Sequence, residues 1–342
     1  MTFSFRQFVL LAAILTLLGT NVRAPAQSPT PKTLPPASRV TYEDVTQKSG
    51  INFKHSFGEQ KLSSIMEATG SGCAWIDYNN DGLLDLYVVS GRYVDGVTKF
   101  SKPDGMDATN HLYRNNGDGT FTDAAFESGV GIINQYVAWG CGFLDYDNDG
   151  WPDILQVNGH VYPEIETQPT GQSFKNPRLV YKNLGGGRFK DVSAELGPGI
   201  SERFSSRGAA LGDYDNDGDI DALILNMSDL PSLLRNDGGN AQNWIKIKLI
   251  GTKCNRTAIG ARVRVVTGNH SQIDEVHSGG SVMSQSDLRL HFGLGKTQVI
   301  DALEVKWPTT QKVERFTQVK ANQILTIREG SGIVDTFKPN SK

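Results

Sequence analysis

One nine-residue pattern, D-x-[DN]-x-D-G-x-x-D, occurs three times in this chain. The copies start at Asp77, Asp145 and Asp213, so they are 68 residues apart both times. The match extends further, because most of the segment from Tyr113 to Asp123 recurs 68 residues later, from Tyr181 to Asp191. Self-similarity at a fixed period indicates a repeat architecture built from one small structural unit. We call the three copies the first loop (77–85), the second loop (145–153) and the third loop (213–221).

Each repeat has the composition of a set of short strands. A run of small and apolar residues precedes each loop, an apolar run follows it, and a turn such as Asn116-Gly-Asp-Gly then marks a hairpin. Glycine is abundant, at 37 of 342 residues, and long helix-period runs are absent. Four short strands per unit are typical of a propeller blade. The sequence therefore predicts an all-β fold of propeller type with about three blades. It does not decide whether these blades close into a ring.

The pattern changes at Asn243, where the repeats end. Apolar and polar residues alternate in the segments that begin at Trp244, Ala261 and Leu303, which predicts a second, small β-domain with one solvated face. Lys and Arg occupy outward positions on these strands. We interpret them as a solvated sheet face in preference to a basic binding stripe.

The first 38 residues have a different character. Arg6, the apolar run from Phe8 to Leu18 and the small residues around Ala26 describe an export signal, too short to serve as a stable membrane span. A Pro- and Ser-rich spacer follows. The expected organisation is thus a signal peptide (1–26), a linker (27–38), the repeat domain (39–240), the C-terminal β-domain (241–330) and a tail (331–342). We therefore expect a secreted or periplasmic protein. The alternative is that the signal stays uncleaved and tethers the protein to the membrane.

The three loops have the chemistry of calcium sites. Side chains at positions 1, 3 and 5 converge because Gly at position 6 permits a sharp turn, position 7 offers a carbonyl, and the last Asp closes the shell. Ca²⁺ takes six to eight oxygen ligands, and this array supplies only oxygens. The predicted ligands are Asp77, Asn79, Asp81, Leu83 and Asp85; Asp145, Asp147, Asp149, Trp151 and Asp153; and Asp213, Asp215, Asp217, Asp219 and Asp221.

Two other structures compete with calcium sites as interpretations of the loops. An EF-hand is excluded, because Val88, Gln156 and Ile224 stand where its bidentate Glu is required. Solvated Asp/Asn/Gly turns remain the simpler alternative, but three copies in register favour about three structural Ca²⁺ ions. The first loop, with Asn79 in place of an Asp, is expected to be the weakest site.

Net charge argues against a nucleic-acid partner. The formal charge is −3, and the loops alone hold 12 Asp, so the acidity is concentrated where a cation would neutralise it. Three cysteines cannot form a dense disulfide framework. We expect Cys73 and Cys141, at equivalent positions before two loops, to be small buried side chains, with a disulfide between them as the alternative.

The C-terminal motifs resemble a known family. The segments starting at Gly251, Ser278 and Glu304 are similar to the ASPIC/UnbV domain, and the loops with their hairpins resemble FG-GAP/VCBS repeats. This combination, over roughly residues 40 to 330, is that of bacterial relatives of cartilage acidic protein. The resemblance implies extracellular calcium binding and an adhesion or scaffold role. Such proteins usually have more repeats, so this chain is expected to form an open arc or to cover its blade edges by self-association.

Two classes of function fit these features. A binding module for an extracellular protein or glycan would use the long insertion from Asn158 to Pro177, with Asn158, His160, Tyr162 and Arg207 as candidate contacts. The alternative is a secreted enzyme acting on polysaccharide. Its motifs are lacking, and Asp287, Arg289 and His291 are better interpreted as structural residues on a strand. The sequence therefore favours the binding module and identifies no catalytic residue.

Overall fold

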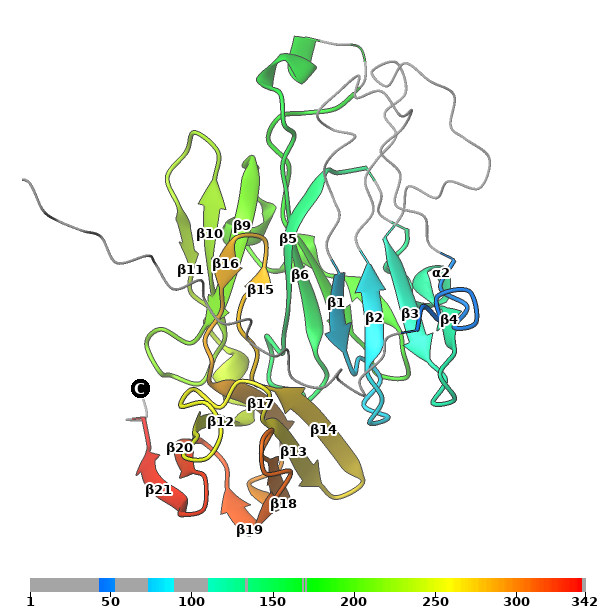
Figure 1. Cartoon of the computed structure of the whole chain (residues 1–342). Coiled ribbons are helices and arrows are strands. Elements are labelled where there is room, and N and C mark those ends of the chain that lie inside the picture. Colours follow the sequence, from blue (N-terminus) through cyan, green and yellow to red (C-terminus); the bar gives the residue numbers. More distant parts are fainter. Residues whose placement is uncertain are drawn as a thin grey trace, which may run out of the picture. The chain divides into compact units, whose positions relative to one another are not determined.

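We analysed a computed structural model, which describes residues 43–52, 73–88, 110–132, 135–167, 169 and 171–339. The predicted signal peptide and linker lie outside these residues. The described residues from Val45 onward form one compact unit, which is all-β apart from single helical turns (Figure 1). Among the described residues no helix is long and apolar enough to cross a membrane.

The repeats form three antiparallel sheets with the same strand order. The first contains β1 (Cys73–Ile76), β2 (Asp85–Val88), β3 (His111–Asn115) and β4 (Phe121–Asp123). The second contains β5 (Ala138–Leu144), β6 (Asp153–Asn158), β7 (Leu179–Asn183) and β8 (Phe189–Asp191). The third contains β9 (Ser206–Gly212), β10 (Asp221–Asn226) and β11 (Ser232–Leu234). Each Asp loop joins the first two strands of its sheet, which confirms the predicted blade unit.

In the described part of the chain, five short helical turns connect these strands and the next domain. They are α2 (Ala125–Ser128), α3 (Pro198–Ser201) and the 3₁₀ turns η2 (Pro163–Thr167), η3 (Ser193–Glu195) and η4 (Gly239–Ala241).

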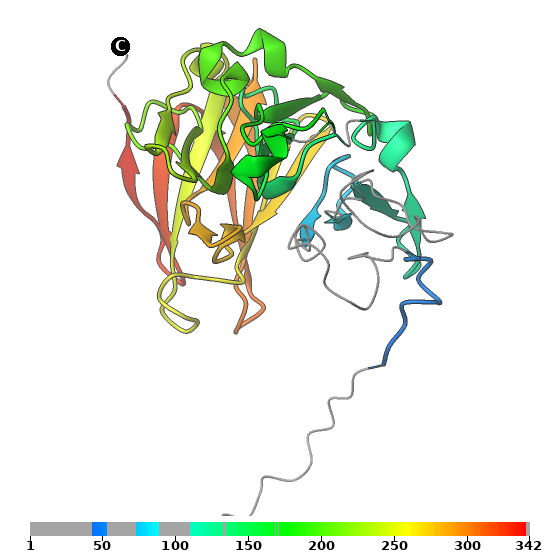
Figure 2. The same ribbon diagram turned by 90° about the horizontal axis from the view of Figure 1, so that it is seen from above.

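The second sheet is buried on both faces. Side chains alternate along its strands, so neighbouring residues pack against different sheets. Ile154 of β6 packs in a cluster with Tyr87 and Leu112 of the first sheet. Its neighbour Leu155 packs in a separate cluster with Ile224 of the third sheet. The three sheets are thus stacked face to face in chain order, and Figure 2 shows them side by side.

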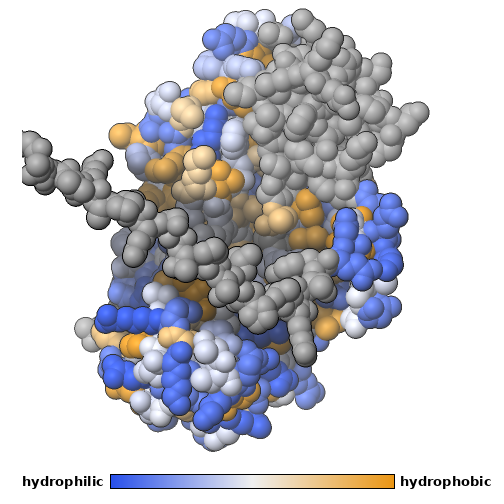
Figure 3. All heavy atoms as spheres, viewed as in Figure 1, coloured by the Kyte–Doolittle hydropathy of each residue, from blue (hydrophilic) through white to orange (hydrophobic). Residues whose placement is uncertain are grey.

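No described element covers the far face of the third sheet. On β10, Ile224 is fully buried while Leu223 and Leu225 are 44% and 50% exposed, and Leu233 of β11 is 55% exposed. Figure 3 shows apolar side chains gathered over this part of the molecule. In a longer array this is the face on which another blade would pack.

The C-terminal region forms two further sheets around one core. The sheet β17-β12-β20-β21 packs on the sheet β14-β13-β18-β19, and Trp307 and Ile245 are among the fully buried residues between them. The strands are β12 (Asn243–Ile250), β13 (Arg262–Thr267), β14 (His270–Glu275), β17 (Leu290–Gly295), β18 (Val299–Lys306), β19 (Val313–Lys320), β20 (Gln323–Arg328) and β21 (Gly332–Phe337).

Two details of this region differ from the sequence prediction. Residues 331–342 were expected to be a tail, but they contain strand β21. Thr326 of β20 pairs with Asp335, so β21 extends the sheet. Among the described residues, five sheets have three or more strands, against about three predicted blades. The difference is the two C-terminal sheets.

A two-stranded hairpin of the C-terminal region packs against the repeats. It consists of β15 (Gly280–Ser281) and β16 (Ser284–Gln285), and it contacts β5 and β9. Gly140 and Gly208 make room for it, since a Cβ at either position would lie 2.8 Å or less from Ser281 Oγ or Ser284 Oγ. This contact explains the small residues that precede the second and third loops.

The cysteines correct one prediction. All three are free thiols, so the alternative disulfide is not formed. Cys73 is exposed and Cys141 is half-buried, which makes the expectation of two buried side chains wrong for Cys73. This residue is on the first strand of the first sheet, where no described sheet precedes it.

Candidate metal centres at the repeat loops

The three loops are held by one recurring set of backbone hydrogen bonds. In the second loop, the two carboxylate oxygens of Asp145 accept the N–H groups of Asp149 and Gly150 at 3.0 and 2.7 Å. Asp153 accepts the N–H groups of Tyr146 and Asn183 at 3.2 and 2.7 Å.

The first and third loops repeat these bonds. Asp77 and Asp213 accept from the corresponding N–H groups, as do Asp85 and Asp221. The first and last Asp of each loop are therefore fixed by the backbone before any ion binds.

Position 4 of each loop adopts a left-handed backbone conformation. Asn80, Asn148 and Asn216 have φ values of 56°, 56° and 58°, and the Gly residues two positions later also have positive φ. Asn and Gly tolerate this region better than other residues do. The Asn-Asp-Gly core of the pattern is thus the local reason why the chain turns sharply enough to bring positions 1, 3 and 5 together.

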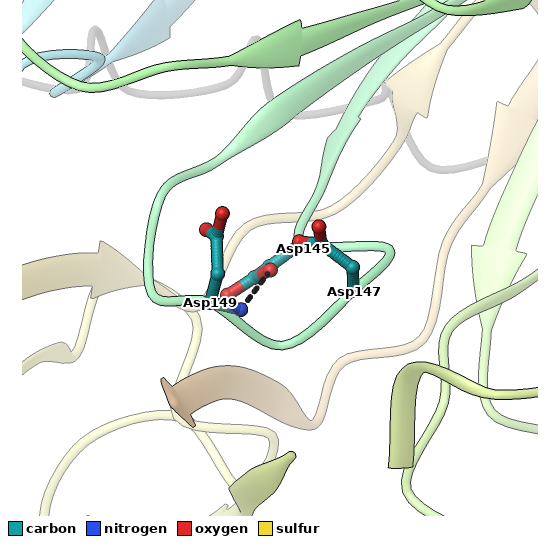
Figure 4. A group of neighbouring side chains, drawn as sticks. All are labelled: Asp145, Asp147 and Asp149. Atoms are coloured by element: carbon teal, nitrogen blue, oxygen red, sulfur yellow. Dashed lines mark hydrogen bonds between the residues drawn. The ribbon is translucent and has the colours of Figure 1, made fainter. Parts of the chain in front are cut away.

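Carboxylates converge in the second and third loops. Asp145, Asp147 and Asp149 each present an oxygen within 4.8 Å of the others, and so do Asp213, Asp215 and Asp217. Figure 4 shows the three side chains of the second loop rising from one turn. Asp147 Oδ1 is buried and accepts no hydrogen bond. An oxygen in that position suits a hard cation such as Ca²⁺.

Burial makes these carboxylates reluctant to ionise without a cation. Desolvation raises the pKa of Asp145 to about 8 and that of Asp153 to about 9. In the first loop it raises the pKa of Asp77 to about 6 and that of Asp85 to about 7. A bound divalent ion would favour the charged forms.

A lysine enters the second loop. Lys182 of β7 pairs with Asp147 and, at 3.1 Å, with Asp149. Its ammonium group neutralises part of the acidic cluster and competes with a metal ion for the same oxygens.

The third loop receives a lysine from the C-terminal region. Lys246 of β12 is fully buried, and its Nζ lies 2.9 Å from Asp213 Oδ2. Burial lowers the pKa of this lysine. The ring of Trp244 lies against Gly218, where a Cβ would be 1.9 Å from the indole. The C-terminal domain is therefore in contact with the loop itself.

The first loop is the least acidic. Asn79 Nδ2 donates a hydrogen bond to Asp81 Oδ2 at 2.8 Å. An Asp in place of Asn79 would instead repel the carboxylate of Asp81. That the first site is the weakest stays a prediction.

Adjacent loops are joined by hydrogen bonds that sequence reasoning missed. Asn80 Nδ2 donates to Gly150 O at 3.2 Å, and Asn148 Nδ2 donates to Gly218 O at 3.1 Å. The third Asn, Asn216, belongs to the last loop. Its Oδ1 accepts a hydrogen bond from Arg289 Nη1 at 2.6 Å. Asn at position 4 in all three copies was the available signal.

The residues considered for catalysis hold this junction together. His291 Nε2 lies 2.6 Å from Asn148 Oδ1, and Arg289 also donates to Asp213 O and to Asp287. Burial lowers the pKa of His291 well below its usual value. Their contacts support the structural interpretation.

The candidate ligand residues near the long insertion are mostly engaged in internal contacts. His160 O accepts hydrogen bonds from Ser205 Oγ and Arg207 Nη2. The guanidinium carbon of Arg207 lies 4.4 Å from the centre of the Trp139 ring. Asn158 is fully buried and donates to Pro177 O, whereas Tyr162 is 38% exposed. The structure brings His160, Tyr162 and Arg207 together and directs Asn158 elsewhere.

Comparison with known families matches this architecture. Residues 77–155 match the FG-GAP-like repeat, and residues 251–334 match the ASPIC and UnbV domain. The chain therefore combines FG-GAP-like repeats with an ASPIC/UnbV domain, as its sequence motifs predicted.

Curated relatives carry the name cartilage acidic protein 1. The chain is 28% identical to the protein of Xenopus tropicalis over 275 residues, which cover 66% of this chain and 42% of the relative. It is 25% identical to the Homo sapiens and Mus musculus proteins over the same length. The chain spans about two fifths of the length of these relatives.

Proposed function

We propose that this protein is an exported binding or scaffold module whose repeats are stabilised by about three Ca²⁺ ions. The observation that carries the proposal is the second loop, where three convergent carboxylates include the buried, unbonded oxygen of Asp147. The third loop has the same cluster, and the first has the same backbone frame.

The calcium would act on stability. The clustered carboxylates repel one another when ionised, and an ion that binds the folded chain alone stabilises it by mass action. Mg²⁺ is expected to substitute poorly, because it requires a smaller octahedral shell. The loops would then fix the blade edges from which a binding surface is presented.

The test is a calorimetric titration of Ca²⁺ into the chelator-treated mature chain, paired with thermal melts. We expect a stoichiometry near three, a higher Tm in Ca²⁺ and little change in Mg²⁺. Asp149→Asn should weaken or remove one site. Asp118→Asn, which changes an exposed acid in a hairpin turn outside the loops, should leave all three. A melt that chelator does not alter would refute the proposal.

Export and partners are also proposed. The N-terminal signal supports export from the cytoplasm, and an extracellular protein or glycan is the proposed partner. Self-association through the exposed apolar face of the third sheet is a further proposal, supported by Leu223, Leu225 and Leu233. Sedimentation of the mature chain, with Leu225→Lys as the variant, would detect it; a monomer at all concentrations would argue against it.

A further inference from the structure

A groove of about 1020 Å³ lies on the outer face of β12 and β20. Its position follows from strand alternation. Ile247 and Leu249 point into the core between the two C-terminal sheets, so Lys248 points to the opposite face. The partner strand places Thr326 beside Lys248, and Arg328 is on the same face two residues further along.

The groove is strongly basic. Lys248, Arg256, Arg289 and Arg328 line it, and Asp287 is the single acid among the lining residues. Arg289 already pairs with Asp287 at 2.6 Å. The other three basic side chains are exposed, and among the described residues they form no ion pair. The groove therefore offers three cationic groups that pair with no acid in the described part of the chain.

One wall of the groove is held rigid by a buried acid. Glu329 Oε2 accepts the N–H groups of Thr252, Lys253 and Cys254 at 2.7 to 3.0 Å. These bonds fix the loop that carries Arg256. They also stabilise the negative charge of Glu329 through backbone N–H groups. The site is thus preorganised, which lowers the entropic cost of binding.

The floor of the groove cannot add a further strand. Strand β12 is already paired with β17 and β20, and β20 with β12 and β21. An extended peptide that binds by strand addition needs a free sheet edge, and neither floor strand has one. Recognition here must use side chains, including the apolar groups Leu288, Ile324 and Phe337 that line the groove.

We propose that this groove binds an acidic oligosaccharide. Its carboxylate or sulfate groups would pair with Lys248, Arg256 and Arg328, and its apolar ring faces would lie on Phe337, which is 52% exposed. Arg presents a planar fork that matches such oxyanions. This inference rests on the proposed binding role and names its ligand class.

The groove adjoins the third loop. Asn216 lines it, and Arg289 joins Asn216 to the groove wall. Ca²⁺ in that loop would reduce the negative charge beside the groove, so acidic ligands should bind more tightly in calcium than in chelator.

The experiment measures binding of defined oligosaccharides to the full mature chain in calcium buffer. The probes are an oligogalacturonate, a sulfated oligosaccharide of equal length and a neutral oligosaccharide. A poly-glutamate peptide tests the alternative of an acidic peptide. We expect one acidic oligosaccharide to bind and the neutral one not to bind, and the two acidic arms identify carboxylate or sulfate as the recognised group.

The decisive variant is Lys248→Gln/Arg328→Gln. We expect it to weaken binding about tenfold or more, which corresponds to about 1.4 kcal/mol. The control Lys306→Gln/Lys320→Gln removes two exposed positive charges from the other C-terminal sheet and should change the Kd by less than about threefold. Thermal melts establish that both variants are folded.

Three outcomes would overturn the proposal. They are no binding of either acidic oligosaccharide, equal weakening in both double variants, and tighter binding of poly-glutamate than of the sugars. Calcium titration of the same samples separates this failure from that of the proposed function: intact calcium stabilisation without sugar binding rejects the groove alone.

Discussion

Lys182 lies in the acidic cluster of the second loop, a candidate metal centre. Its ammonium group pairs with Asp147 and Asp149, two of the three clustered acids. A divalent ion entering the second loop must displace it. The third repeat has Arg235 at the equivalent position, and that side chain pairs with Asp237 outside the loop. The same position thus supplies an ammonium group to the second loop, whereas in the third loop the lysine that contacts an Asp is Lys246.

We therefore predict that Lys182→Gln tightens calcium binding at the second loop. Removing a competing ammonium group is expected to lower one of the calcium Kd values by about tenfold, or about 1.4 kcal/mol. Titration calorimetry would measure it. Lys190→Gln, which changes an exposed lysine paired with Glu195, serves as control, and an unchanged Kd in Lys182→Gln would show that the ion pair does not compete.

Glu329 is a second residue with a defined energetic role. Burial by itself would raise its pKa, but the N–H groups of Cys254, Lys253 and Thr252 lower that pKa to about 2. Because the pKa is lower in the folded chain, this carboxylate stabilises the fold above about pH 4.5. The contribution is lost as the pH falls toward 2.

Glu329→Gln should accordingly destabilise the protein at neutral pH. We expect a loss of about 1–3 kcal/mol in the free energy of unfolding at pH 7, and a smaller loss at pH 3. Urea denaturation at the two pH values tests this, with the exposed Glu195→Gln as control. An equal loss at both pH values would contradict the role of the charge.

At the scale of the element, the loops were the most predictable part of the chain. The convergence of their acids at positions 1, 3 and 5, seen in the second and third loops, follows from spacing alone, because a nine-residue turn with Gly at position 6 has few conformations. The role of position 4 was not predictable in the same way. Asn148 contacts Gly218 of the next loop and His291 of the C-terminal domain, and both partners are far away in sequence.

The loops also predict a dependence of stability on pH. Burial raises the pKa of Asp145 to about 8 and that of Asp153 to about 9 in the folded chain. A raised folded-state pKa stabilises the protein below the unfolded value, near 4, and this contribution is lost as the pH rises through the folded value. The metal-free protein should hence lose stability between pH 5 and pH 9.

Thermal melts in chelator at pH 5, 7 and 9 would measure this trend. We expect the Tm to fall across the series and calcium to raise it most at pH 9, where protons compete least for the carboxylates. A metal-free Tm that increases with pH would contradict the predicted sign. The variant Asp118→Asn should follow the wild-type trend.

At the scale of the whole molecule, the sequence predicted the two regions but not their contact. Alternation placed Lys246 on an outward face of the C-terminal sheet, and the solvated-face interpretation expected water there. In the structure Asp213 covers it, and its side chain is fully buried. Alternation identifies the two faces of a strand, whereas it cannot tell which face another domain covers.

This buried pair yields a further prediction. Lys246→Met leaves Asp213 without its ammonium partner, and breaking a buried ion pair typically costs about 3–5 kcal/mol. We expect such a loss in chelator and a smaller one in calcium, because the ion can neutralise Asp213 in place of the lysine. Lys248→Met, two residues along the same face but exposed, is the control. Equal losses with and without calcium would separate Lys246 from the metal site.

The bonds from each Asn to the next loop make the array extensible. Each repeat offers a donor at position 4 and an acceptor at the Gly carbonyl, as Asn80 with Gly150 and Asn148 with Gly218 show. A 68-residue unit inserted between two repeats would find both partners in place, while Arg289 would still close the final loop. Proteins of this architecture can thus vary in length by whole units without redesigning the junction with their C-terminal domain.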